Sequence, residues 1–98
     1  MAAPIYVKPA DDAPTCHVFV GNCGPRHGFA YSRVLQLLQP FGPILHHHEG
    51  VANMWATLES EANAAAAVLA LQGHRPEPDA KPLIAEFAAT RRRQVRLP

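Results

Sequence analysis

Early in the chain stands the stretch Val18-Phe19-Val20-Gly21-Asn22, which places one aromatic ring between two β-branched residues and then breaks at a glycine. Side chains alternate between the two faces of a β-strand, so Val18 and Val20 are expected to point into a core while Phe19 points to the opposite face. A second aromatic residue, Trp55, lies in a later apolar segment. Two aromatic rings on one sheet face are typical of a surface on which bases stack.

Size and composition limit the class of protein. The chain has 98 residues, enough for one domain with a single core. It contains no apolar run long enough to cross a bilayer, and its N-terminus lacks a signal-peptide pattern. We therefore expect no membrane partner and a cytoplasmic or nuclear location. Cys16 and Cys23 flank the first predicted strand and are expected to be reduced thiols.

Charge is unevenly distributed along the chain. Residues 1–90 hold five basic and eight acidic residues, a net charge of −3, and the remaining basic residues are Arg91, Arg92, Arg93 and Arg96. Nucleic-acid-binding domains usually carry a basic surface. Any RNA contact made by the body of this chain must therefore depend on stacking and on a few local cations.

The apolar periodicity predicts six secondary-structure elements. They are strands at about residues 16–21, 43–48, 51–58 and 83–87, and two helices N-capped by Ser32 and Ser60. The order is strand, helix, strand, strand, helix, strand. This order predicts an α+β fold, a ferredoxin-like βαββαβ sandwich in which a four-stranded antiparallel sheet carries two helices on one face.

The same pattern divides the chain into three parts. Residues 1–15 are predicted to form an extended N-terminal arm, residues 16–88 the domain, and residues 89–98 a basic C-terminal tail. In the predicted topology the first and third strands of the domain are neighbours at the centre of the sheet. Phe19 and Trp55 should therefore lie side by side on the face that the helices leave open.

Several segments match those of one known family. Val18-Phe19-Val20-Gly21-Asn22-Cys23 is similar to its shorter signature on the first strand, with Cys23 where leucine is usual. Pro40-Phe41-Gly42-Pro43-Ile44 and Leu71-Gln72-Gly73-His74 are similar to its junctions after the two helices. Over residues 16–88 the chain thus resembles an RNA recognition motif. The resemblance implies an RNA-binding module that stacks single-stranded RNA on its sheet face.

The third predicted strand departs from the pattern of this family. The family has a basic residue, a glycine and an aromatic residue where this chain has Val51, Ala52 and Asn53. Only Trp55 keeps a stacking position. The resemblance therefore implies RNA binding of modest affinity, in which Asn53 can hydrogen-bond a base edge but cannot replace a stacked ring.

A narrower resemblance concerns the glycine-rich loop from Asn22 to Gly28, together with the layout from Phe29 to Gly42. It is similar to the RNA recognition motif at the N-terminus of AlkB-homologue enzymes that modify the wobble uridine of tRNA. This would imply that the chain is part of a larger RNA-processing or tRNA-modifying protein, with tRNA as a partner and catalysis elsewhere.

Two functions remain open from the sequence. The first is RNA binding, for which we expect contacts from Phe19, Asn22, Arg26, Asn53, Trp55, Arg75, Arg91, Arg92 and Arg93. The second is a protein–protein interaction module on the same fold, in which the acidic body, Val51 and Asn53 mark a face turned toward a protein partner.

Metal binding and catalysis find little support in the sequence. Along a strand, His46 and His48 share a face and His47 points away, so at most two imidazoles of this run could reach one ion. We expect these histidines at the sheet edge, where a neutral ring can stack and a protonated ring can meet phosphate. Arg26 and Asn53 match an acylphosphatase only by analogy of fold. We therefore expect no enzyme activity, no cofactor and no metal.

Overall fold

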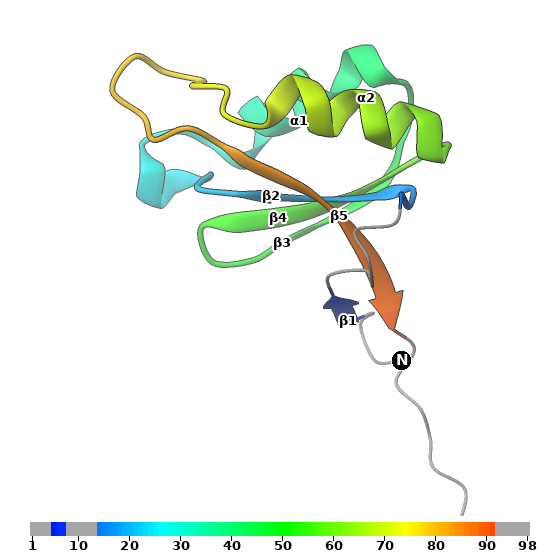
Figure 1. Ribbon diagram of the computed structural model, residues 1–98. Helices are drawn as coiled ribbons and strands as arrows, with labels where there is room; N and C mark the ends of the chain where they lie inside the picture. The colour runs from blue at the N-terminus through cyan, green and yellow to red at the C-terminus, as the bar shows by residue number, and fades with distance from the viewer. Residues whose placement is uncertain (1–4, 8–13, 92–98) are drawn as a thin grey trace, which may run out of the picture.

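The computed structural model describes residues 5–7 and 14–91, which form one antiparallel sheet covered by two helices on one face (Figure 1). The strand order across the sheet is β1-β5-β2-β4-β3. The strands are β1 (Ile5–Val7), β2 (His17–Gly21), β3 (Ile44–Glu49), β4 (Asn53–Leu58) and β5 (Ile84–Arg91). The helices are α1 (Tyr31–Leu38) and α2 (Glu61–Leu71), with short 3-10 turns η2 (Pro25–His27) and η3 (Gln39–Phe41). The predicted ferredoxin-like fold is confirmed.

The core lies between the sheet and the helices. Val18 and Val20 of β2 are fully buried, as the alternation predicts, and so are Met54, Ala56 and Leu58 of β4. Burying apolar surface of this kind is the main favourable term in folding. The helices complete the core with Val34, Leu38, Ala64, Ala67 and Leu71. The alanines leave room for α2 to approach the sheet closely.

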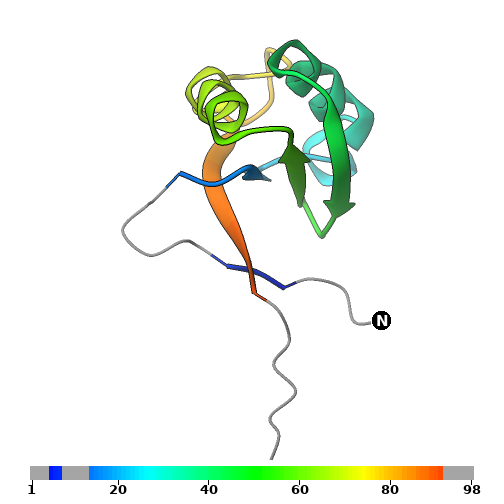
Figure 2. The ribbon, with the colours of Figure 1, turned by 90° about the vertical axis from the view of Figure 1, so that its right-hand side faces the viewer.

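A fifth strand extends the sheet beyond the predicted four. Residues 5–7, which the sequence places in an extended arm, pair as β1 with Ala89, Thr90 and Arg91. β5 is therefore longer than predicted and runs three residues into the predicted tail. Pairing between β2 and β5 ends at His17 and Ala88, and β1 pairs with the three residues of β5 that follow. Figures 1 and 2 show that this end of β5 and β1 extend away from the helices.

The two helix starts differ from each other. Ser60 caps α2 as predicted, because its Oγ accepts a hydrogen bond from the Asn63 backbone N–H at 3.1 Å. Ser32 does not cap α1. The helix begins two residues earlier than predicted, at Tyr31, and its N-cap is Ala30, which makes no side-chain cap hydrogen bond.

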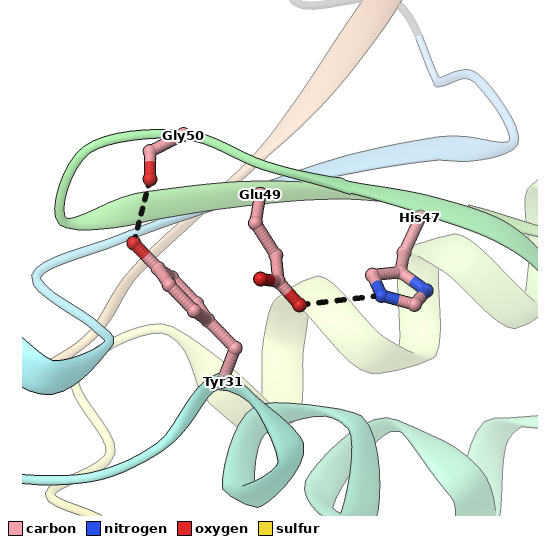
Figure 3. A network of polar contacts seen from close by, with 4 residues as sticks. All are labelled: Tyr31, His47, Glu49 and Gly50. Carbon is pink, nitrogen blue, oxygen red and sulfur yellow. Dashed lines mark hydrogen bonds and ion pairs between the residues drawn. The ribbon is translucent and has the colours of Figure 1, made fainter.

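The hydroxyl of Tyr31, the first residue of α1, binds the turn between β3 and β4 (Figure 3). This hydroxyl donates to the Gly50 carbonyl at 2.7 Å and accepts from the Ala52 backbone N–H at 3.1 Å. The Cys23 backbone N–H donates to the Ala52 carbonyl at 3.1 Å from the other side. Ala52 has a φ of 59°, a left-handed conformation, so β4 begins at Asn53 and not at Val51 as predicted.

Removal of the Tyr31 hydroxyl should loosen this turn. We expect Tyr31→Phe to lower the free energy of unfolding by about 1–2 kcal/mol, because two hydrogen bonds are lost while the ring is kept. Ser32→Ala is the matched control, since Ser32 is an exposed neighbour in the same helix and does not cap it. Urea unfolding of both variants measures the difference. Equal stability of the two variants would contradict a stabilising role for the two hydrogen bonds of the Tyr31 hydroxyl.

Candidate nucleic-acid interface

The face opposite the helices is built by the register of three neighbouring strands. Phe19 lies directly opposite Trp55 in the β2–β4 ladder, and His48 lies opposite Trp55 in the β3–β4 ladder. His17, Thr57 and His46 form a second row in the same way. We call this side of the sheet the open face; its central residues are His17, Phe19, His46, His48, Asn53, Trp55 and Thr57, and Glu86 of β5 borders it opposite Phe19.

Phe19 and Trp55 form the centre of the open face. Their ring centroids lie 5.6 Å apart and their planes are tilted by 57°. Such tilted pairs are favourable because the positive edge of one ring meets the negative face of the other. Both residues are half-buried, so each ring is held from one side and accessible from the other. The prediction that the two aromatics lie side by side at the centre of the sheet is confirmed.

Two glycines leave room for these rings. A Cβ atom at Gly21 would lie 3.1 Å from Cε2 of Phe19, and a Cβ atom at Gly50 would lie 2.9 Å from Cζ3 of Trp55. Any other residue at either position would push the ring beside it. Gly21 therefore ends β2 and also leaves room for the Phe19 ring.

His48 extends the row of rings to the sheet edge. Its centroid lies 5.9 Å from that of Trp55, with an interplanar angle of 43°. The predicted sharing of one face by His46 and His48 agrees with their partners Thr57 and Trp55. His47 points to the helix side, where its Nε2 lies 3.4 Å from Oε2 of Glu49 (Figure 3). His48 was not among the named RNA-contact residues, although the sequence did place this histidine run at the sheet edge, where an imidazole can stack or meet phosphate.

The second row contains a polar pair that the sequence did not reveal. Nδ1 of His17 lies 2.7 Å from Oγ1 of Thr57, and Thr57 is only 5% exposed. Burial lowers the pKa of His17, and the nearby imidazole of His46 lowers it further. The two residues are 40 positions apart in sequence, so only the register brings them together.

Asn53 lies beside the rings but its oxygen is not presented outward. Oδ1 of Asn53 is buried and has no hydrogen-bond partner among the residues that the structure describes. It packs against Gly50, where an added Cβ would collide with it. An oxygen buried in this way reaches a base edge only after the side chain rotates.

The other predicted contact residues lie in loops, at the end of β5 or outside the described ranges. The Asn22 amide donates to the Pro82 carbonyl at 3.1 Å and so ties the loop after β2 to the segment before β5. Arg26 is exposed in η2, and Arg75 is exposed in the α2–β5 loop next to Pro76, whose carbonyl accepts from Arg33 of α1. Arg91 ends β5, whereas Arg92 and Arg93 lie outside the described residues.

The described residues show neither a metal-ligand cluster nor a membrane-spanning helix. Within residues 5–7 and 14–91 no three histidine, cysteine or acidic side chains come together as they would around a metal ion. No helix within these ranges is long and apolar enough to span a bilayer. Cys16 and Cys23 are free thiols, and burial raises the pKa of Cys23 to about 11.

The environment of His17 can be measured directly. We expect an NMR titration to give His17 a pKa below its ordinary value of 6.5, and His46→Gln to raise it because a neighbouring positive charge is removed. The unfolded chain then binds more protons than the folded one at this residue, so its contribution to stability falls as the pH drops through about 6.5. A His17 pKa at or above 6.5 would contradict the buried His17–Thr57 arrangement.

Comparisons with solved structures agree on the fold. No family model and no curated protein matches the sequence. The crystal structure of the RRM domain of S. pombe Puf1 is 19% identical and matches 74% of this chain and 96% of its own, with a TM-score of 0.66. The C. elegans NONO-1 homodimer is 23% identical and matches 76% of this chain, with a TM-score of 0.63. An SXL-lethal protein/RNA complex is 15% identical and matches 79%, with a TM-score of 0.64.

The last two matched chains are longer, since the match spans 29% of the NONO-1 chain and 48% of the SXL-lethal chain. At these identities the similarity concerns the fold and leaves the ligand open. The strand order, the two helices on one face and these structural neighbours together show that this chain has the fold of an RNA recognition motif domain.

Proposed function

We propose that this chain is an RNA-binding module that stacks the bases of single-stranded RNA on Phe19 and Trp55. The observation that carries the proposal is the central position of these two rings, 5.6 Å apart, on the face that the helices leave open. Aromatic rings in the middle of an open sheet offer flat surfaces that suit any base. An SXL-lethal protein/RNA complex of the same fold supports the choice of ligand.

The surroundings of the rings favour stacking of modest strength. Both side chains are already held by their neighbours, which reduces the conformational entropy lost on binding. The body of the chain, however, carries a net charge of −3 over residues 1–90, so phosphate attraction contributes little there. We assign the electrostatic part of binding to Arg26 and to the basic residues Arg91, Arg92 and Arg93 after the domain. Arg75 and Asn22 are weaker candidates for RNA contact. Arg75 lies in the α2–β5 loop next to Pro76, which binds Arg33 of α1, and the Asn22 amide already donates to the Pro82 carbonyl.

The wider setting that we propose is a larger RNA-processing or tRNA-modifying protein, acting in the cytoplasm or nucleus. Its support is the resemblance of the loop from Asn22 to Gly28 to the domain found in AlkB-homologue enzymes. In such a protein this chain would bind the RNA, and we assign no reaction to its own residues.

A protein–protein interaction module is the second candidate. It is favoured by Val51, which is 66% exposed in the β3–β4 turn, and by Leu45, which is 58% exposed in the edge strand β3. Exposed apolar residues beside an open sheet face suit a protein partner. The fold also matches part of a chain, 29% of its length, that was solved as the C. elegans NONO-1 homodimer.

Substitution of the two rings separates these functions. We expect Phe19→Ala and Trp55→Ala each to weaken binding of a short single-stranded oligonucleotide by ~1–3 kcal/mol, about fivefold to more than a hundredfold in Kd. Fluorescence anisotropy at low salt measures the change, with circular dichroism to verify folding.

Leu69→Ala is the control for this experiment, because Leu69 is 82% exposed on α2 and far from the rings in the sheet. It should leave the Kd unchanged. If the Phe19→Ala/Trp55→Ala double variant bound RNA as tightly as the unmodified chain, the RNA proposal would be overturned and the protein-interaction candidate favoured.

A further inference from the structure

The edge strand β3 carries three consecutive histidines whose two faces have different surroundings. His46 and His48 are exposed on the open face, opposite Thr57 and Trp55. His47 lies on the other face of the strand with Glu49. Histidine is the side chain whose charge changes most readily between pH 5 and 8. Two of the three imidazoles are therefore placed where a proton would change the charge of the open face.

We propose that the RNA-binding surface extends onto β3, where protonated His46 and His48 bind RNA phosphates and make the affinity for RNA rise as the pH falls. This inference rests on the proposed function, because it adds an electrostatic contact to the same face. It goes beyond that function by naming the residues that supply phosphate binding and the condition under which they do so.

The geometry supports contact with the backbone of a stacked strand. The row Phe19, Trp55, His48 crosses three neighbouring strands, with centroid separations of 5.6 and 5.9 Å. Neighbouring strands lie about 4.8 Å apart, so His46 and His48 are one strand beyond Trp55. An RNA strand that stacks a base on Trp55 and continues across β3, the neighbouring edge strand, brings its phosphates past these imidazoles.

The net charge of the chain makes protonation of the two histidines important for attraction of RNA phosphates. Residues 1–90 have a net charge of −3 with histidine neutral, so two added protons remove most of this excess. The other described titratable groups on this side of the sheet are His17 on β2 and Glu86, which lies opposite Phe19 on β5 and is separated from β3 by β2 and β4. Glu59 follows β4 directly and is exposed, and Glu49 follows His48 on β3. His17 contributes least, because burial and His46 lower its pKa.

The test measures binding of oligouridylate to the whole chain at pH 5.5 and pH 8 over a range of salt concentrations. Uracil gains no proton in this interval, so a change in affinity reports on the protein. We expect tighter binding at pH 5.5, by about twofold to fivefold per histidine. The slope of log K against log salt should be steeper at pH 5.5 by ~0.7 for each protonated histidine that contacts a phosphate.

Three variants assign the effect to residues. His46→Gln and His48→Gln should each remove part of the pH dependence and of the added salt slope. His47→Gln is the matched control, because His47 is their neighbour on the opposite face of the same strand. It should leave both quantities unchanged. In the unmodified chain, addition of oligouridylate at pH 5.5 should shift the imidazole NMR signals of His46 and His48 but not those of His47.

The outcomes distinguish this inference from the proposed function. RNA binding that depends on Phe19 and Trp55 but is independent of pH would overturn the role of the histidines and leave the stacking proposal intact. An equal loss of pH dependence in His47→Gln and in the two open-face variants would also overturn it. No RNA binding at either pH would overturn both proposals.

Discussion

The pairing of β2 with β4 in one particular register is the constraint on which the site depends. It places Phe19 opposite Trp55 and His17 opposite Thr57. At the same time it buries Val18 and Val20 against the helices. A shift of β2 by one residue would move its valines to the open face and Phe19 into the core, and the apolar burial of both valines would be lost. The burial that stabilises the fold therefore also fixes the position of the two rings.

The β3–β4 hairpin gives the register a second support. Tyr31 of α1 and Cys23 of the loop after β2 both bind the turn at Ala52, so helix, loop and hairpin meet directly beside the first residues of β4. Gly50 in the same turn makes room for the Trp55 ring and for the Asn53 side chain. The contacts of α1 and of the loop after β2 with the hairpin turn thus fix the strands that carry the open face. A pre-formed surface of this kind loses less entropy on binding than a flexible one.

Much of the fold followed from the sequence because its signals are local. Alternation around Phe19, the Ser60 cap and the apolar stripes of the helices each depend on residues close together in the chain. The parts that were missed depend on distant contacts. Three residues, Ile5–Val7, are too few to show a strand period, and only β5 makes them a strand. Ser32 is a better capping residue than Ala30, yet α1 begins at Tyr31, whose hydroxyl binds the distant Gly50 carbonyl.

The same reasoning applies to the candidate site. The two rings were predictable from their strands. The buried oxygen of Asn53 and the His17–Thr57 pair were not, since both follow from the turn geometry and the register. The resulting surface combines rings with titratable imidazoles and has few fixed cations, which distinguishes it from the strongly basic surfaces on which phosphate contacts dominate affinity.

Amide chemical-shift mapping is the most direct measurement of whether the open face binds RNA. In a titration of isotope-labelled chain with oligouridylate, the largest shifts should fall on the residues of β2 and β4 and on the Trp55 indole, while the amides of α1 and α2 stay in place. Shifts confined to the helices, or an unchanged Trp55 indole at saturating RNA, would contradict binding at the Phe19 and Trp55 rings.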